Sequence, residues 1–418
     1  MDMEKHRHRQ ISYYMADLVL GFSVFLFFVC TCNGSISLDG KKGGGLSSSS
    51  ILFPVSGNVY PLGYYSVTVQ IGNPPKKFDM DIDTGSDITW IQCDAPCKGC
   101  TKARHELYKP KNNVVFCKDP LCSAITPHCQ HPNEQCDYTL QYADQGSSLG
   151  VLVSDTFHLN SSNGSGISPP VTFGCGYDLH YNGRDPPSTS GVLALGGGKA
   201  SINSQLHTLG VIENVVGHCF GENGGYLFLG RRLVPPEIKW IPSPIHPTDM
   251  HYTSGPAEFL FDGTKTDLLG LYLTFDSGSS YSYLNSKAYG IVLNLIRSQL
   301  DHRLKPAEDD NTLPVCWKGS KPFKSFHELK GYFKSMSLNF KKVKNTQFPL
   351  NPSDYLILSK KGNVCFGILN GTEVGLGDAN VIGDIFMRDK VVVYDINNRK
   401  VGWAYGNCRK NTKFQTDL

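Results

Sequence analysis

The residues of this chain best suited to chemistry are two aspartates, each placed after an apolar, strand-like run and before a small hydroxyl residue and a glycine. The first copy reads DTG at residues 83–85, and the second reads DSG at residues 276–278. A single triplet of this kind is usually a turn, because Asp, Ser and Gly favour turn conformations. The two aspartates lie 193 residues apart (276 − 83), about half of the 418-residue chain. This spacing indicates a duplicated unit in which each half supplies one carboxylate.

Asp83 and Asp276 form the candidate catalytic pair. Two carboxylates a few Å apart do not ionise together readily, so they share one proton over a wide pH range. The ionised member acts as a general base on water, while the protonated member polarises a carbonyl oxygen. Such a pair hydrolyses an amide bond without a metal ion, a cofactor, or a Ser or Cys nucleophile. The pair therefore predicts hydrolysis of peptide bonds at acidic pH.

The residues beside each aspartate have supporting roles in this prediction. Gly85 and Gly278 allow the backbone to turn tightly next to the opposite half of the protein. The hydroxyl groups of Thr84 and Ser277 are placed to brace the two turns against each other.

Each triplet is followed by further matching segments. Both halves contain a strand-like run with Phe-Gly, VTFGCG at 171–176 and VCFGIL at 364–369. Both also contain an apolar run that ends in glycine, which matches Gly196 of GVLALGGG with Gly383 of NVIGDIF. The repeated order of these segments indicates two lobes of the same construction.

Two further long segments carry a family resemblance, YPLGYYSVTVQIGNPPKKFDMDIDTGSDITWIQCDAPC and NVIGDIFMRDKVVVYDINNRKVGWA. In them the chain resembles pepsin-like aspartic proteases. Within them it is similar to the plant nucellin-like and nepenthesin-type branch, from about residue 60 to residue 408. The resemblance implies an all-β, bilobal acid protease fold, mainly β with few short helices, and a cleft between two homologous lobes. It implies that Asp83 and Asp276 lie at the cleft floor, that Tyr142 is carried by a flap hairpin, and that Trp90 is its hydrogen-bond partner.

The resemblance also implies how a peptide or protein substrate is held. Tyr142, Trp90 and the turns at Thr84–Gly85 and Ser277–Gly278 are expected to contact it. Bulky apolar side chains are expected on both sides of the cleaved bond, because the aromatic residues supply apolar surface. The second triplet departs from the family in having Ser277 rather than Thr, which keeps the hydroxyl, and Ser190 replaces a more usual Asp.

Most of the chain has the pattern of a β protein. Short runs rich in Val, Ile, Phe and Tyr alternate with turns rich in Gly, Pro and Asn. The clearest helical pattern covers residues 285–304, with apolar residues at Val292, Leu295 and Ile296.

The N-terminal stretch differs from the rest of the chain in composition. A basic start and an apolar run at 18–32 predict a secretory signal peptide, because the run is shorter than the roughly twenty residues of a membrane span. The Gly- and Ser-rich residues that follow are predicted not to pack. The predicted segments are the signal peptide at 1–34, a short pro or leader segment at 35–58, the N-terminal catalytic lobe at 59–238 with a Cys-rich insertion (93–136) and the flap, the C-terminal catalytic lobe at 239–410, and a tail at 411–418.

These features predict an exported protein of the secretory pathway, located in the apoplast or in a vacuole. A net charge of +3 with 18% charged residues gives no indication of a nucleic-acid partner. A monomer is expected, because both halves of the site are on one chain.

Cysteines are unusually frequent, and seven of the fourteen lie between residues 93 and 136. Removal of Cys30 and Cys32 with the signal peptide leaves twelve, an even number that favours disulfides over a zinc site in an exported chain. The sequence alone does not give the pairing. The resemblance implies the pairs Cys93–Cys97, Cys100–Cys175, Cys117–Cys136, Cys122–Cys129, Cys219–Cys408 and Cys316–Cys365.

Acceptor sequences for N-linked glycans begin at Asn160, Asn163 and Asn370, next to turn-forming residues. They predict surface positions in an exported glycoprotein.

Two other functions fit parts of the sequence. Some plant proteins of this superfamily have lost catalytic residues and bind and inhibit other enzymes, whereas this chain retains Asp83, Asp276 and Tyr142. A carbohydrate-binding β-sandwich accounts for the strand pattern and the glycan acceptors, but it does not account for the duplicated triplets.

Overall fold

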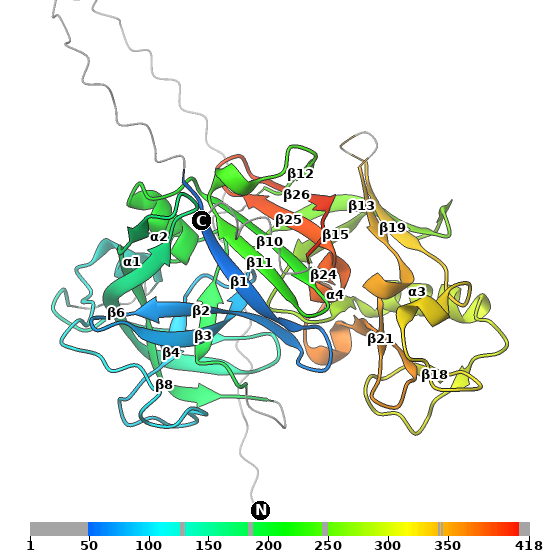
Figure 1. Cartoon of the computed structure of the whole chain (residues 1–418), viewed down its shortest axis with the longest axis horizontal. Helices are drawn as coiled ribbons and strands as arrows, with labels where there is room; N and C mark the ends of the chain where they lie inside the picture. Colours follow the sequence, from blue (N-terminus) through cyan, green and yellow to red (C-terminus); the bar gives the residue numbers. More distant parts are fainter. Residues whose placement is uncertain are drawn as a thin grey trace, which may run out of the picture. The chain divides into compact units, whose positions relative to one another are not determined.

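Figure 1 shows the computed structural model of the chain, in which the described residues are 49–125, 129, 131–182, 187–244, 250–341, 343 and 346–408. The predicted signal peptide, residues 35–48 of the predicted leader and the tail at 411–418 lie outside them. Residues of the leader that are described form strand β1 (Ile51–Asn58), in which Ile51 and Val55 are buried. The prediction that this segment does not pack is therefore wrong for β1, whose alternating apolar side chains cover one face of a sheet.

The strands of the described ranges form three sheets. The largest has fourteen strands in the order β12-β26-β25-β10-β11-β1-β2-β3-β9-β4-β8-β6-β5, with β7 paired to β6. Besides β1, its strands are β2 (Tyr64–Ile71), β3 (Lys76–Asp83), β4 (Trp90–Gln92), β5 (Asp137–Gln141), β6 (Ser147–Asn160), β7 (Gly166–Ile167), β8 (Pro170–His180), β9 (Gly191–Ala194), β10 (Val215–Gly221), β11 (Gly224–Leu229), β12 (Lys239–Pro242), β25 (Lys390–Asp395) and β26 (Lys400–Tyr405).

The other two sheets belong to the second half of the chain. An eight-stranded sheet has the order β20-β19-β13-β15-β24-β16-β23, with β14 paired to β13, and a four-stranded sheet has the order β17-β18-β22-β21. Their strands are β13 (Thr253–Phe261), β14 (Thr264–Lys265), β15 (Leu271–Phe275), β16 (Ser282–Leu284), β17 (Lys305–Pro306), β18 (Cys316–Lys318), β19 (Met336–Phe340), β20 (Gln347–Leu350), β21 (Leu356–Leu358), β22 (Val364–Phe366), β23 (Ile368–Asn370) and β24 (Val381–Ile382).

The helices are few and mostly short, so the prediction of a mainly β chain is confirmed. The α-helices of the described residues are α1 (Pro120–Ile125), α2 (Ile202–Thr208), α3 (Ser286–Ser298) and α4 (Asp384–Met387), and the 3-10 turns are η1 (Arg231–Leu233), η2 (Phe326–Leu329), η3 (Pro352–Asp354) and η4 (Thr372–Val374). Within these ranges no helix is long and apolar enough to cross a bilayer.

Helix α3 shows how the local sequence sets an element. The side chain of Asn285 accepts a hydrogen bond of 3.0 Å from the Ala288 backbone N–H, which caps the first turn. Val292 and Ile296 are buried, as their four-residue spacing predicts. The helix ends at Ser298, earlier than the predicted residue 304.

The two halves of the chain repeat one strand arrangement around their aspartates. In the first half, β3 ends at Asp83 and lies parallel to β9, and β9 pairs antiparallel with β4. In the second half, β15 ends one residue before Asp276 and lies parallel to β24, and β24 pairs antiparallel with β16. The duplication inferred from the sequence is therefore present in the strand pairing.

The hydrogen bonds correct one detail of that duplication. The backbone N–H of Ala194 donates to the Thr89 hydroxyl at 3.0 Å, and the backbone N–H of Gly383 donates to the Ser282 hydroxyl at 3.0 Å. Both acceptors stand six residues after the aspartate of their half. Gly383 therefore corresponds to Ala194, and its match with Gly196 is wrong by two residues. Because the apolar run at 191–198 ends in several glycines, the sequence does not show which of its residues corresponds to Gly383.

The last strands of the chain complete the sheet that begins with its first strands. β25 pairs antiparallel with β10, and β26 pairs with β25 and β12. Figure 1 shows β25 and β26, coloured orange to red, beside the green β10 and β11 and the blue β1. A disulfide between Cys219 in β10 and Cys408 after β26 fastens the same junction covalently.

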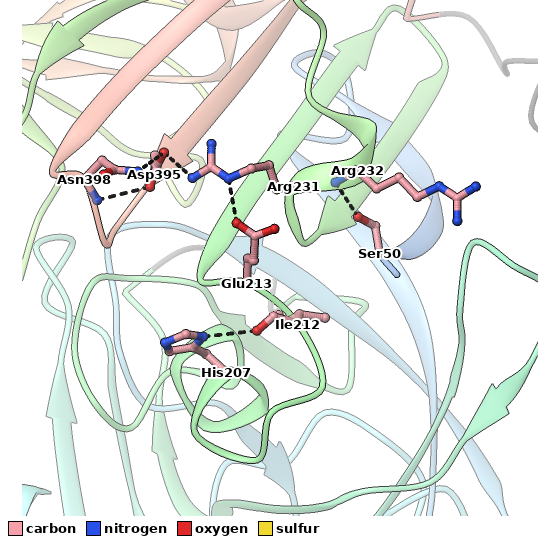
Figure 2. A network of polar contacts seen from close by, with 8 residues as sticks. All are labelled: Ser50, His207, Ile212, Glu213, Arg231, Arg232, Asp395 and Asn398. Carbon is pink, nitrogen blue, oxygen red and sulfur yellow. Dashed lines mark hydrogen bonds and ion pairs between the residues drawn. The ribbon is translucent and has the colours of Figure 1, made fainter. Parts of the chain in front are cut away.

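A polar network joins the same two parts of the chain at one end of the sheet (Figure 2). The Arg231 guanidinium donates to Glu213 Oε2 at 2.7 Å and to Asp395 Oδ2 at 2.5 Å. Asp395 is buried and also accepts hydrogen bonds from the backbone and the side chain of Asn398. Arg231 thus offsets the cost of burying the Asp395 carboxylate.

Six disulfides link all twelve cysteines of the described residues. The expected pairs Cys219–Cys408 and Cys316–Cys365 are present. The other four expected pairs are wrong, because the structure has Cys93–Cys175, Cys97–Cys100, Cys117–Cys129 and Cys122–Cys136 instead. Cys93 and Cys175 lie close because the backbone that follows β4 runs beside β8, a tertiary contact that sequence spacing does not reveal.

The mature chain is expected to contain no free thiol and the six bonds given above. Alkylation without reductant should leave the intact mass unchanged, and peptide mapping should recover a fragment that joins Cys93 to Cys175. Uptake of one alkylating group per molecule, or recovery of a Cys93–Cys97 fragment, would contradict this prediction.

Candidate active site

The two aspartates are held by mirrored sets of hydrogen bonds. Asp83 Oδ1 accepts from the Gly85 backbone N–H at 2.8 Å, and its Oδ2 accepts from the Ser86 hydroxyl at 2.5 Å. Asp276 Oδ1 accepts from the Gly278 backbone N–H at 2.9 Å, and its Oδ2 accepts from the Ser279 hydroxyl at 2.7 Å. Each carboxylate is therefore oriented by donors two and three residues later in its own turn.

The hydroxyl residues of the two turns join them to each other. The Thr84 backbone N–H donates to Ser277 Oγ at 3.1 Å, and the Ser277 backbone N–H donates to Thr84 Oγ1 at 2.9 Å. Each hydroxyl also donates to a carbonyl of the opposite strand, Thr84 to Phe275 and Ser277 to Ile82. All these groups are buried, so the bracing expected from the sequence is present as a reciprocal set of four hydrogen bonds.

The glycines of the triplets let the two turns approach closely. A Cβ atom added to Gly85 would lie 2.5 Å from Asp276 Oδ1, and one added to Gly278 would lie 2.5 Å from Asp83 Oδ1. Both separations are far below a van der Waals contact. Each glycine therefore faces the aspartate of the other half, and a side chain at either position would push the carboxylates apart.

The electrostatics of the pair favour a shared proton. Burial, followed by the charge of Asp276, raises the pKa of Asp83 from its usual 3.8 to about 7. The hydrogen bonds from Ser86 and Gly85 oppose this change because they stabilise the ionised form. The pair therefore retains one shared proton in mildly acidic solution.

A hairpin carries Tyr142 over the pair. Strands β5 and β6 pair antiparallel, and the Tyr142 backbone N–H donates to the Gly146 carbonyl at 2.8 Å to close their turn. We call residues 142–146 the flap tip. Trp90 Nε1–H donates to the Tyr142 hydroxyl at 2.6 Å, which is the contact expected from the resemblance. Burial and then the charge of Asp83 hold the pKa of Tyr142 well above its usual value, so the phenol stays neutral.

The structure adds residues that the sequence did not single out. Ser86 and Ser279 bind the outer carboxylate oxygens, and their equal offset from the two aspartates was the available signal. Asp384, the first residue of α4, is buried, and its Oδ1 has no hydrogen-bond partner in the described part of the chain. Burial and the charges of Asp276 and Asp83 raise its pKa well above the usual value.

The other predicted sites fall outside this region. All seven cysteines of 93–136 take part in disulfides, so none of them is a thiolate ligand for zinc in this structure. Asn160 and Asn163 are exposed near the β6–β7 turn, and Asn370 is half-buried with its side-chain oxygen accepting from Ser286. Glycan attachment at these positions stays a prediction.

Paired strands, mirrored carboxylates and a hairpin over them define the pepsin-like class of acid protease folds, and comparisons with known proteins agree. The basic 7S globulin from soybean superposes with a TM-score of 0.66 over 85% of this chain and 96% of that protein. The two chains are only 16% identical, so this likeness concerns the bilobal fold.

Sequence comparisons give the family. The families described as xylanase inhibitor N-terminal and xylanase inhibitor C-terminal match residues 65–231 and 264–405. An aspartic proteinase of Oryza sativa subsp. japonica is 38% identical over 380 residues, which cover 86% of this chain and 92% of the relative. Aspartic proteinase 39 of Arabidopsis thaliana is 30% identical over 394 residues, which cover 88% and 80%. The chain belongs to the family of plant aspartic proteinases.

The pKa of Asp83 predicts how stability depends on pH. Between about pH 4 and pH 7 the folded protein retains a proton that the unfolded chain releases, so the free energy of unfolding falls as pH rises through this window. Replacement of Asp83 by Asn removes this proton uptake, so the fall in melting temperature from pH 4 to pH 7 should become smaller. Equal pH profiles for both proteins, measured by calorimetry, would contradict this.

The bracing hydrogen bonds predict a cost for one small substitution. Ser277→Ala removes one bond donated to the Ile82 carbonyl and one accepted from the Thr84 N–H, both buried. The free energy of unfolding should fall by about 1–3 kcal/mol, measured by chemical denaturation. Ser277→Thr is the matched control, because it keeps the hydroxyl and reproduces the residue of the first turn. Equal stability of the Ala and Thr variants would show that the bonds contribute nothing.

Proposed function

We propose that this protein is an aspartic endopeptidase that hydrolyses peptide bonds at acidic pH. The observation that carries the proposal is the mirrored pair, in which Asp83 and Asp276 have the same donors and lie on turns that brace each other. Burial of one carboxylate beside another costs free energy. Two equivalent carboxylates at one junction therefore indicate a functional role. Membership of the plant aspartic proteinase family supports the same activity.

The proposed reaction assigns one role to each aspartate. Asp276 accepts a proton from a water molecule, whose oxygen forms a bond to the carbonyl carbon of the peptide, while Asp83 donates its proton to the carbonyl oxygen. The resulting gem-diol breaks its C–N bond when the leaving nitrogen receives the proton from Asp276. A diol hydroxyl then returns its proton to Asp83 as the acid product forms, and the pair regains its starting state.

The remaining predicted site residues support this reaction in the proposal. Tyr142, oriented by Trp90, covers the substrate from the flap tip, and Thr84 and Ser277 hold the two turns in position. The substrates are peptides or proteins, and the protein acts as a monomer without metal or cofactor.

The finer assignments remain proposals as well. The motifs around DTG at 83–85 and DSG at 276–278 support the nucellin-like and nepenthesin-type branch. The disulfides support export, because such bonds persist in oxidising compartments. The protein is thus proposed to be a glycosylated member of the secretory pathway, secreted to the apoplast or held in a vacuole, with a cleaved signal peptide and the lobe boundaries predicted from the sequence.

A second candidate function is binding without catalysis. It is favoured by the family descriptions, which name xylanase inhibitors. The retained pair Asp83 and Asp276 and the Trp90–Tyr142 contact argue for the peptidase.

Loss of either catalytic carboxylate should abolish turnover. Asp83→Asn lacks the proton that is given to the carbonyl oxygen, and Asp276→Asn lacks the base that takes a proton from water. The purified mature chain should cleave a peptide library at about pH 3–5 and lose activity as pH rises through 7, where the pair gives up the shared proton of its active form. Both Asn variants should remain folded by circular dichroism and fall to background.

The control is a statine-type inhibitor, which should block the unmutated chain. Undiminished cleavage by a folded Asn variant would mean that another residue carries the chemistry. Absence of cleavage by the unmutated chain on every substrate would instead favour the binding protein.

A further inference from the structure

Asp81 belongs to β3, the strand that ends at Asp83, and has no role in the reaction proposed above. Asp81 stands two residues before Asp83, and alternate residues of a strand point to the same face. Phe78, Met80 and Ile82 are buried on the opposite face of β3. The side chain of Asp81 is therefore on the same side of the sheet as the catalytic carboxylate.

Only one of the two oxygens of the Asp81 carboxylate accepts a hydrogen bond in the described part of the chain. Its Oδ2 accepts a hydrogen bond of 2.9 Å from the Thr189 hydroxyl. Its Oδ1 is buried and has no hydrogen-bond partner in the described ranges, and the same holds for the Tyr181 hydroxyl. A buried carboxylate oxygen and a buried phenol without partners each cost free energy, so this local arrangement is retained against stability.

The charge of Asp81 acts on groups of several elements, including Tyr142 of the flap tip. After burial, the charge of Asp81 is a further cause that raises the pKa of Tyr181 to about 12, and it also contributes to the raised pKa values of Tyr142 and Asp384. Lys102 acts on Asp81 in the opposite sense, yet burial prevails and raises the pKa of Asp81 to about 7. Asp81 therefore lies within electrostatic range of Tyr142, which the proposed function places over the substrate.

The duplicated half provides an internal comparison. The residue two positions before Asp276 is Thr274, a neutral side chain whose hydroxyl is 2.8 Å from that of Thr253. The first half thus has an incompletely paired acid where the second half has a paired hydroxyl. The two sides of the dyad differ in charge although their backbones repeat.

We propose that Asp81, with Thr189 and Tyr181, forms a subsite that selects a basic side chain, lysine or arginine, at one of the two positions flanking the scissile bond. This inference rests on the proposed peptidase function and names its substrate class. The ammonium or guanidinium group donates to Asp81 Oδ1, which gives that oxygen its missing partner. The expectation of apolar side chains on both sides of the bond then holds on one side only.

The charge of Asp81 gives the selection a dependence on pH. In the free protein the carboxyl holds a proton below about pH 7, and a bound cation favours the ionised form. Tyr142, Tyr181 and Asp384 stay neutral in acid because their pKa values are raised, and the pair that includes Asp83 keeps its shared proton there. Lys102 is therefore the charge that competes with the bound cation. Preference for lysine should therefore increase between pH 4 and pH 6.

The test compares peptides that differ only in one charged group. One peptide series carries lysine or norleucine at the position before the scissile bond, and a second series carries them at the position after it. The value of kcat/KM is measured for the unmutated chain, Asp81→Asn and Thr274→Val. Asp81→Asn keeps an acceptor for Thr189 and removes the charge, and Thr274→Val is the matched control from the second half. Active-site titration with a statine-type inhibitor corrects each preparation for misfolded protein.

The unmutated chain is expected to prefer lysine over norleucine at one position. Asp81→Asn should lower that ratio by about 10- to 100-fold, the size expected for one charge-assisted hydrogen bond, and Thr274→Val should not. If norleucine peptides are cleaved, and lysine peptides are cleaved no faster than them at either position, the inference is overturned. The proposed peptidase function would then stand. A ratio unchanged in Asp81→Asn would also overturn it. Absence of cleavage of every peptide would overturn the proposed function itself.

Discussion

The geometry of the candidate active site depends on the reciprocal hydrogen bonds between the two aspartate turns. Thr84 and Ser277 each use a backbone N–H and a hydroxyl to bind the other half, and no water competes for these groups because they are buried. The bonds fix the separation of Asp83 and Asp276, and that separation sets how strongly one charge raises the pKa of the other. Glycine next to each hydroxyl residue is required by the same closeness. The shared proton is thus a property of the lobe junction rather than of either turn.

Much of this site was predictable because it is local and duplicated. The triplets and helix α3 follow from short-range patterns, namely turn residues after an apolar run and apolar residues at helical spacing, and the flap hairpin follows from the family resemblance. The fold class followed from the same patterns together with the family resemblance. The sequence predicts no packing for β1 because Gly and Ser residues before it lower the local apolar content, although Ile51, Phe53 and Val55 alternate as a half-buried strand requires.

The errors and omissions concern contacts between segments distant in sequence. The pairing of Cys93 with Cys175 depends on β4 lying beside β8, and the equivalence of Ala194 with Gly383 depends on strand register. No sequence pattern distinguishes Asp81, because an acid at an alternate position of a strand is ordinarily exposed. Only the fold shows that Tyr181 and Thr189, about a hundred residues later, close around it.

The position of the last strands has a consequence for how the protein is made. In the largest sheet Tyr394 of β25 lies opposite Val216 of β10, 178 residues earlier (394 − 216). Ribosomes deliver the N-terminal strands first, and the edge of β10 stays unpaired until nearly the whole chain has been synthesised. An unpaired strand edge is a site of aggregation, so the nascent first lobe requires protection while the second is being translated. A chain truncated before β25 would have both aspartates and still lack a completed sheet to hold them.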